Sequence, residues 1–102
     1  MDDIKVITIC GSMRFKKEMM EIAEDLELKK GYAVIQCVSG VGTIYDKEAK
    51  DKLGRLHFKK IDISDAIYVV NVGGYIGEST KKEIAYARKH QKEILSLEPL
   101  EL

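Results

Sequence analysis

The sequence predicts an α/β protein with a small parallel sheet between layers of helices. Short apolar, β-branched runs alternate along the chain with stretches of helical periodicity. A strand–helix alternation of this kind is typical of parallel strands joined by right-handed crossovers. Runs that are apolar at almost every position are typical of strands covered on both faces. We therefore expect a three-layer sandwich of the flavodoxin or Rossmann type, with strand order 2-1-3-4 and residues 1–102 in one domain.

The first half of the chain is predicted to form a strand, a helix and a second strand. Ile4 to Cys10 is an almost continuous apolar run and forms the first strand. Ser12 is a good N-cap for a helix that starts near Met13, and Gly31 is the expected residue just past its end. Tyr32 to Cys37 forms the second strand. The buried stripe of the helix is predicted to contain Phe15, Met19, Ile22 and Leu26.

The second half is predicted to add two helices and two strands. A loop over residues 39–43 leads to a helix that starts near Asp46, and the third strand is Ala66 to Val72. A third helix begins near Ser79 or Thr80 and ends near His90, and Glu93 to Leu97 is the fourth strand. The inward face of the second helix is predicted to contain Ala49, Leu53, Leu56 and Lys60.

Composition excludes several classes of function. The 17 basic and 17 acidic residues cancel, which argues against a protein that grips a nucleic acid polymer by bulk charge. The apolar runs are far shorter than the ~20 residues of a membrane helix. No basic region precedes the first apolar run, so we expect no signal peptide, no membrane association and a cytoplasmic location.

The cysteines and histidines show no metal-ligand spacing. Cys10 and Cys37 are expected to stay reduced and to act as small buried hydrophobic residues, with no base nearby. His57 and His90 lie in no ligand pattern, so no metal site is predicted. His57 borders an apolar helix stripe, where a partly buried structural histidine is the usual outcome.

A first candidate binding loop follows the first strand, at the expected switch point of the sheet. Gly11 would let the backbone approach a ligand, and Ser12, Met13 and Arg14 lie at a helix N-terminus that suits a phosphate or a sugar hydroxyl. The alternative is a simple turn with an N-cap and a solvated arginine. No dinucleotide or Walker A fingerprint is present.

A second candidate loop, Gly73 to Gly77, follows the third strand. Glu83 would then lie at the start of a helix, where it either completes a capping box with Thr80 or serves as an oriented nucleophile. Glu78 is either a second carboxylate or a solvated charge. Tyr75 either stacks on a base or packs on its own loop.

These motifs together resemble the nucleoside 2-deoxyribosyltransferase superfamily, which includes nucleoside 5′-monophosphate N-glycosidases. The resemblance rests on Cys-Gly-Ser-Met-Arg after the first strand, on Ile-Tyr-Val-Val-Asn at residues 67–71, and on Gly-Glu-Ser-Thr-x-x-Glu-Ile-x-Tyr-Ala at residues 77–87. It implies that Glu83 attacks C1′ through an oxocarbenium-like transition state, as in retaining glycosidases. It also implies a nucleoside or nucleotide substrate, no cofactor, and a homodimer or larger assembly in which a neighbouring subunit completes the pocket.

The chain departs from the family pattern at two acidic positions. Counted back from Glu83, they fall near residues 57–60 and on Gly77, and neither is aspartate here. His57 or Asp62 is expected to substitute for the first, and Glu78 for the second. The predicted catalytic residues are Glu83, His57 and Asp62. The predicted substrate-binding residues are Gly11, Ser12, Met13, Arg14, Asn71, Gly74, Tyr75, Gly77, Glu78 and Ser79. The alternative function is a non-catalytic nucleotide-binding or sensor module of the same fold.

Overall fold

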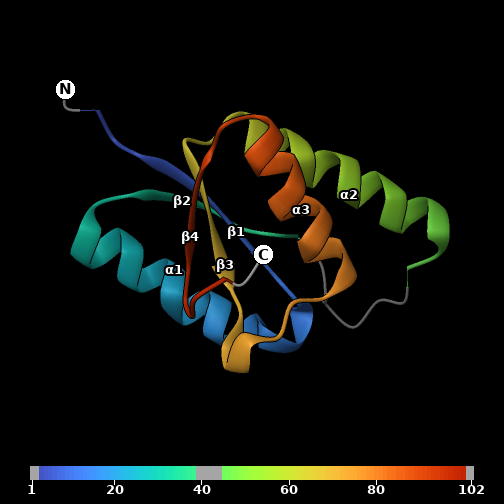
Figure 1. Cartoon of the computed structure of the whole chain (residues 1–102), viewed down its shortest axis with the longest axis horizontal. Helices are drawn as coiled ribbons and strands as arrows, with labels where there is room; N and C mark the ends of the chain where they lie inside the picture. The colour runs from blue at the N-terminus through green and yellow to red at the C-terminus, as the bar shows by residue number, and fades with distance from the viewer. Residues whose placement is uncertain (1–2, 39–44, 101–102) are drawn as a thin grey trace.

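The computed structural model describes residues 3–38 and 45–100 and shows a four-stranded sheet in which every strand is parallel to its neighbour (Figure 1). The strand order is β2-β1-β3-β4, which confirms the predicted topology. The predicted loop over residues 39–43 lies outside the described residues. The strands are β1 (Val6–Gly11), β2 (Ala33–Ile35), β3 (Ala66–Val70) and β4 (Glu93–Ser96), and the helices are α1 (Lys16–Lys30), α2 (Lys47–Asp62) and α3 (Glu78–Lys89).

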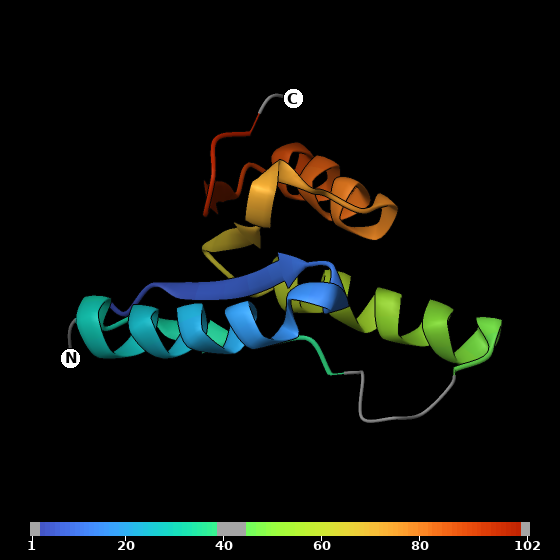
Figure 2. The same cartoon turned by 90° about the horizontal axis from the view of Figure 1, so that it is seen from below.

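The helices cover both faces of the sheet, as a three-layer sandwich requires. Figure 2 shows α1 and α3 on opposite sides of β1. Ile9 and Val70 pack with Met19 and the rest of the apolar face of α1. On the other face, Cys10 and Val69 join a core that α2 and α3 complete through Ile61, Ile84 and Ala87. Alternate residues of each strand therefore enter different cores, which explains why the strand sequences are apolar throughout.

The helix ends follow the local signals in the sequence. Gly31 closes α1 with φ 71°, the left-handed conformation that glycine adopts without strain, and its N–H reaches the carbonyls of the last turn. The Asp46 carboxylate accepts from the N–H of Ala49 at 2.8 Å and caps α2. A short 3₁₀ turn, η1 (Met13–Phe15), precedes α1, so that the helix proper starts at Lys16.

Two predicted details are wrong. The edge strand β2 pairs only from Ala33 to Ile35, because it has a neighbour on one side alone. The inward face of α2 includes the buried His57, whereas Leu56 is half exposed. The prediction placed His57 only at the border of the apolar stripe, as a partly buried structural histidine. The actual face follows Leu53, His57 and Ile61, which are four residues apart along the helix.

A buried amide fixes the C-terminal segment to the end of β3. Asn71 Nδ2 donates to the carbonyl of Glu98 at 3.0 Å, and the N–H of Glu98 donates to Asn71 Oδ1 at 2.9 Å. The Glu98 carboxylate also accepts from the N–H of Gly73. Asn71 therefore serves the fold, although the sequence suggested a substrate contact.

We expect Asn71→Ala to lower the free energy of unfolding by about 2–3 kcal/mol, because it leaves two main-chain groups of Glu98 without partners. Urea denaturation followed by circular dichroism measures the change. Ser79→Ala, at an exposed position, is the matched control and should shift stability by less than about 0.5 kcal/mol. Equal effects of the two substitutions would contradict the role given to Asn71.

Candidate functional site

The two loops that the sequence placed at the switch point are in direct contact. The Arg14 guanidinium lies 3.9 Å from the ring centroid of Tyr75, and Nη2 donates to Tyr75 Oη at 3.3 Å. Phe15 meets the same ring edge-on, with centroids 6.0 Å apart. Ser12 caps η1 by accepting from the N–H of Arg14 at 3.3 Å, as expected of an N-cap. Tyr75 thus packs against the first loop rather than on its own.

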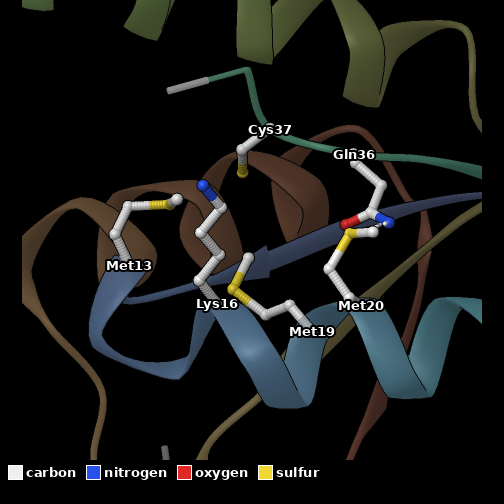
Figure 3. A pocket seen from close by; sticks show the side chains of 6 residues that line it. All are labelled: Met13, Lys16, Met19, Met20, Gln36 and Cys37. Carbon is white, nitrogen blue, oxygen red and sulfur yellow. Dashed lines mark hydrogen bonds between the residues drawn. The ribbon is translucent and has the colours of Figure 1, made fainter. Parts of the chain in front are cut away.

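Gly11 has a structural reason to be glycine. A Cβ atom at this position would lie 3.1 Å from the carbonyl oxygen of Val70 on the neighbouring strand. The close approach is therefore between β1 and β3, whereas the sequence suggested an approach to a ligand. Met13 lines a small cavity of about 110 Å³ against α1, together with Met19 and Cys37 (Figure 3).

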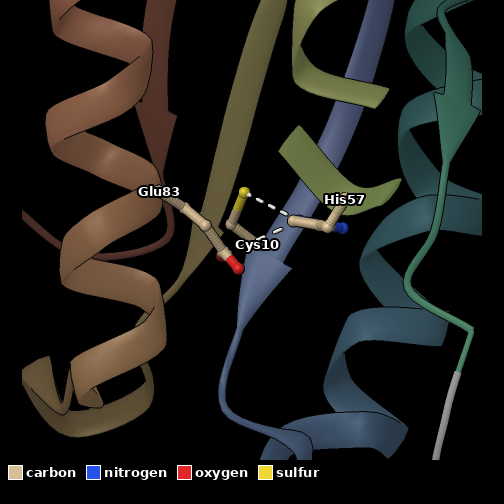
Figure 4. A group of neighbouring side chains, drawn as sticks. All are labelled: Cys10, His57 and Glu83. Atoms are coloured by element: carbon tan, nitrogen blue, oxygen red, sulfur yellow. Dashed lines mark hydrogen bonds and ion pairs between the residues drawn. The ribbon is translucent and has the colours of Figure 1, made fainter. Parts of the chain in front are cut away.

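Glu83 lies in the second turn of α3 and faces the sheet rather than the helix N-terminus. The helix begins at Glu78, and its N-cap is Gly77 with an extended backbone, so the predicted capping box of Thr80 with Glu83 is wrong. Glu83 Oε1 lies 3.7 Å from His57 Nε2, and the Glu83 side chain is only 15% exposed. Cys10 Sγ lies 3.5 Å from the same imidazole nitrogen (Figure 4).

Burial controls the charges of Glu83, His57 and Cys10. It raises the pKa of Glu83 to about 7, and a hydrogen bond with the Cys10 thiol opposes that rise. Burial, and then the nearby Lys60 charge, lower the pKa of His57 to about 4. Burial also raises the pKa of Cys10 well above its ordinary value. At neutral pH the thiol and the imidazole are therefore uncharged, and Glu83 is near half ionisation.

The contacts of His57 correct one expectation about the cysteines. A base does lie beside both of them, because His57 Nδ1 is also 3.7 Å from Cys37 Sγ. An uncharged thiol beside an uncharged imidazole is not an activated nucleophile, since catalysis by cysteine needs the thiolate. The arrangement therefore does not favour cysteine catalysis.

A cleft between α2 and α3 leads to Glu83. Its volume is about 410 Å³, and three cations and two carboxylates lie along it. It is lined by Lys50, Asp51, Gly54, Arg55, Phe58, Ser79, Lys82 and Glu83. Both helices begin at the carboxyl edge of the sheet, where ligands bind in open α/β folds.

Among the predicted substrate-binding residues, Ser79 lines this cleft. The other residues of the cleft, apart from Glu83, were not predicted, although one glycine in the sequence is a signal for them. Gly54 interrupts α2, where glycine costs about 1 kcal/mol relative to alanine. Apart from the adjoining backbone of α2, no atom of the described residues lies within 4 Å of the position of a Cβ there, so close packing does not require glycine. Lys50, Gly54 and Phe58 recur at four-residue spacing on one side of the helix.

The remaining predicted residues lie away from Glu83. Asp62 is exposed at the end of α2, where its carboxylate accepts from Tyr86 Oη, so the structure does not bring it to the cleft. Glu78 is a solvated charge, 85% exposed, and pairs with Lys81 at 3.3 Å. Gly74 has φ 83° and lines a second, larger hollow of about 690 Å³ with Tyr75 and Glu98. Gly77 serves as the N-cap of α3.

The comparisons with known proteins establish the fold class alone. The structure is similar to the crystal structure of a conserved protein from Enterococcus faecalis V583, with a TM-score of 0.66 and 12% sequence identity. The match covers 92% of this chain and 63% of that one, so the present chain spans less than two thirds of its length. No protein-family model and no curated protein matches the sequence. Among the described residues, no helix has both the length and the apolar character to cross a membrane.

Proposed function

We propose that this protein cleaves or transfers at the N-glycosidic bond of a nucleoside, deoxynucleoside or nucleoside 5′-monophosphate, with Glu83 as the nucleophile. One observation carries the proposal: a largely buried carboxylate, which among the described residues forms no ion pair with a lysine or arginine, lines a solvent-open cleft at the carboxyl edge of the sheet. A carboxylate that has lost part of its hydration is well suited to attack an electron-poor carbon. The resemblance of residues 77–87 to the deoxyribosyltransferase motif points to the same residue.

In the proposed reaction a Glu83 oxygen forms a bond to C1′ while the bond from C1′ to the base nitrogen breaks. The electron pair of that bond leaves with the base, which takes a proton from solvent in the open cleft. Water or a second base then attacks C1′ and releases Glu83 as the carboxylate. His57 is uncharged at neutral pH, so we assign it a positioning role beside Glu83 rather than that of a proton donor.

The cleft has the chemical character that a nucleotide requires. Lys50, Arg55 and Lys82 line it and can attract a 5′-phosphate, while the Phe58 ring offers an apolar face to a base. The sequence had placed the phosphate contact at Arg14. In the structure the face of the Arg14 guanidinium is covered by Tyr75, which makes the cleft cations the better candidates.

We expect Arg55→Ala to raise the Kd of 5′-monophosphates about tenfold and to leave the Kd of nucleosides within about twofold, because only the phosphate loses a charged partner. Arg14→Ala is the comparison variant and should have a smaller effect. Isothermal titration calorimetry with a nucleoside and its 5′-monophosphate measures both. If Arg14→Ala weakened binding of the 5′-monophosphate more than Arg55→Ala does, the phosphate would bind at the loops of Arg14 and Tyr75 instead of in the cleft.

The proposed function is tested by incubating the purified chain with the common nucleosides, deoxynucleosides and their 5′-monophosphates. Chromatographic detection of the free base reports cleavage, and an added acceptor base reveals transfer. Base release from one of these classes is the expected result. Binding without base release would instead support the non-catalytic nucleotide-binding module, and neither binding nor release would overturn both.

A further inference from the structure

A cluster of metal-ligand side chains includes Glu83, which lines the cleft. Cys10 comes from β1, His57 from α2 and Glu83 from α3, and one ligand atom of each lies within 4.8 Å of the others (Figure 4). We propose that these three side chains bind a divalent ion of the zinc type. The sequence predicted no metal site, because the three residues lie far apart along the chain and show no ligand spacing.

Two of the three distances between ligand atoms match those around a single ion, and the third, between Cys10 and Glu83, is within 4.8 Å. A tetrahedral zinc ion with bonds of about 2.0–2.3 Å separates its ligand atoms by roughly 3.3–3.8 Å. Cys10 Sγ and His57 Nε2 are 3.5 Å apart, and His57 Nε2 and Glu83 Oε1 are 3.7 Å apart. These separations need little movement of the side chains around a bound ion. The mixture of a sulfur, an imidazole nitrogen and a carboxylate oxygen is a donor set that zinc accepts.

The surroundings of the cluster also favour a cation. Cys10 and His57 are almost fully buried, and within residues 3–38 and 45–100 no lysine or arginine forms an ion pair with Glu83. The thiol and the carboxyl group would release their protons to solvent as the metal bonds form.

His57 is also contacted on its other ring nitrogen. Cys37 Sγ lies 3.7 Å from Nδ1, closer than the 4.0 Å that separates it from Nε2. The two distances differ by only 0.3 Å, so the Cys37 thiol lies near both ring nitrogens rather than at the edge opposite Nε2. This contact helps to hold the imidazole in place beside Cys10 and Glu83.

Metal binding goes beyond the proposed N-glycosidase chemistry and does not depend on it. An ion bound to a Glu83 oxygen would occupy the nucleophile, so the zinc-bound protein should release no base. Binding itself is measured without any nucleotide. A chain that binds zinc but releases no base even when it is free of metal would refute only the proposed function.

The test uses the full chain, reduced and freed of metal with a chelator, and titrated with Zn²⁺ and separately with Co²⁺. We expect one equivalent of each ion to bind, with a higher Tm for the zinc form. The cobalt form should show a thiolate-to-metal charge-transfer band and the intense visible bands of a tetrahedral ion. Absence of binding, or a cobalt spectrum without the thiolate band, would overturn the proposal.

Substitutions then identify the ligands. Cys10→Ser and His57→Gln should each weaken zinc binding by at least roughly 100-fold. Cys37→Ser should weaken it by no more than about tenfold, and His90→Gln, at an exposed position outside the cluster, should have no effect. Circular dichroism verifies that each variant is folded. If a variant is not folded, the titration of the wild-type chain still tests the proposal. Retention of the thiolate band in Cys10→Ser would refute the assignment.

Discussion

Glu83→Gln should lower the rate of base release by at least roughly a thousandfold while the protein stays folded. Glutamine keeps the shape of the side chain but cannot form the glycosyl-enzyme ester. The melting temperature should change by only a few degrees, roughly the effect of about 1 kcal/mol, because Glu83 is already half protonated near neutral pH and makes no capping contact. Chromatography of the released base and thermal unfolding measure the two quantities.

Glu78→Gln is the matched control for this substitution. It makes the same chemical change five residues earlier on the same helix, at a side chain that is 85% exposed. Its rate of base release should stay within about twofold of the wild type. If Glu83→Gln retained activity, Glu83 would not be the nucleophile, whatever other residue carried the reaction.

The rate of base release should rise with pH and level off above about pH 7, because the ionised carboxylate is the nucleophile. Burial raises the pKa of Glu83 to about 7. Below that value the ionised fraction, and with it the rate, should fall about tenfold for each pH unit. Cys10 and His57, which face Glu83, do not titrate in this range, since the pKa of His57 is about 4 and that of Cys10 is well above its ordinary value. The other charged groups of the cleft are Lys50, Asp51, Arg55 and Lys82.

The profile is measured as kcat/KM with a chelator present, so that no metal occupies Glu83. Cys10→Ala gives a directional check. It removes the hydrogen bond that lowers the pKa of Glu83, so the midpoint of the profile should move to higher pH. A rate that falls above about pH 7 would show instead that Glu83 acts in its protonated form, as a general acid.

Local sequence was sufficient to predict the fold class, because each element carries its own signal. Apolar runs predicted strands covered on both faces, and Gly31 and Asp46 predicted helix ends that the structure contains. The strand order followed from the alternation of elements and the rule for their crossovers. The errors fall where a neighbouring element decides the outcome. A single partner strand limits the length of β2, and the contacts of α2 with the sheet turn His57 inward.

The candidate site was only partly predictable for the same reason. Sequence motifs singled out Glu83 and His57 separately, and they placed the loops of Arg14 and Tyr75 at one edge of the sheet. They did not show that Cys10 meets His57, which is 47 residues away in the chain. They did not show the cleft either, since its walls come from two helices separated by β3.

The sequence by itself determined the parallel sheet and its topology, and its motifs singled out Glu83 as the candidate nucleophile. Periodicity and capping depend on residues a few positions apart, so they can be inferred from the order of amino acids. Only the tertiary structure decided what surrounds Glu83: a cysteine, a histidine and a cleft with cations along its walls. Burial and distance are set by packing between elements far apart in the chain, and these two quantities control the charge of Glu83 and the ligands it can meet.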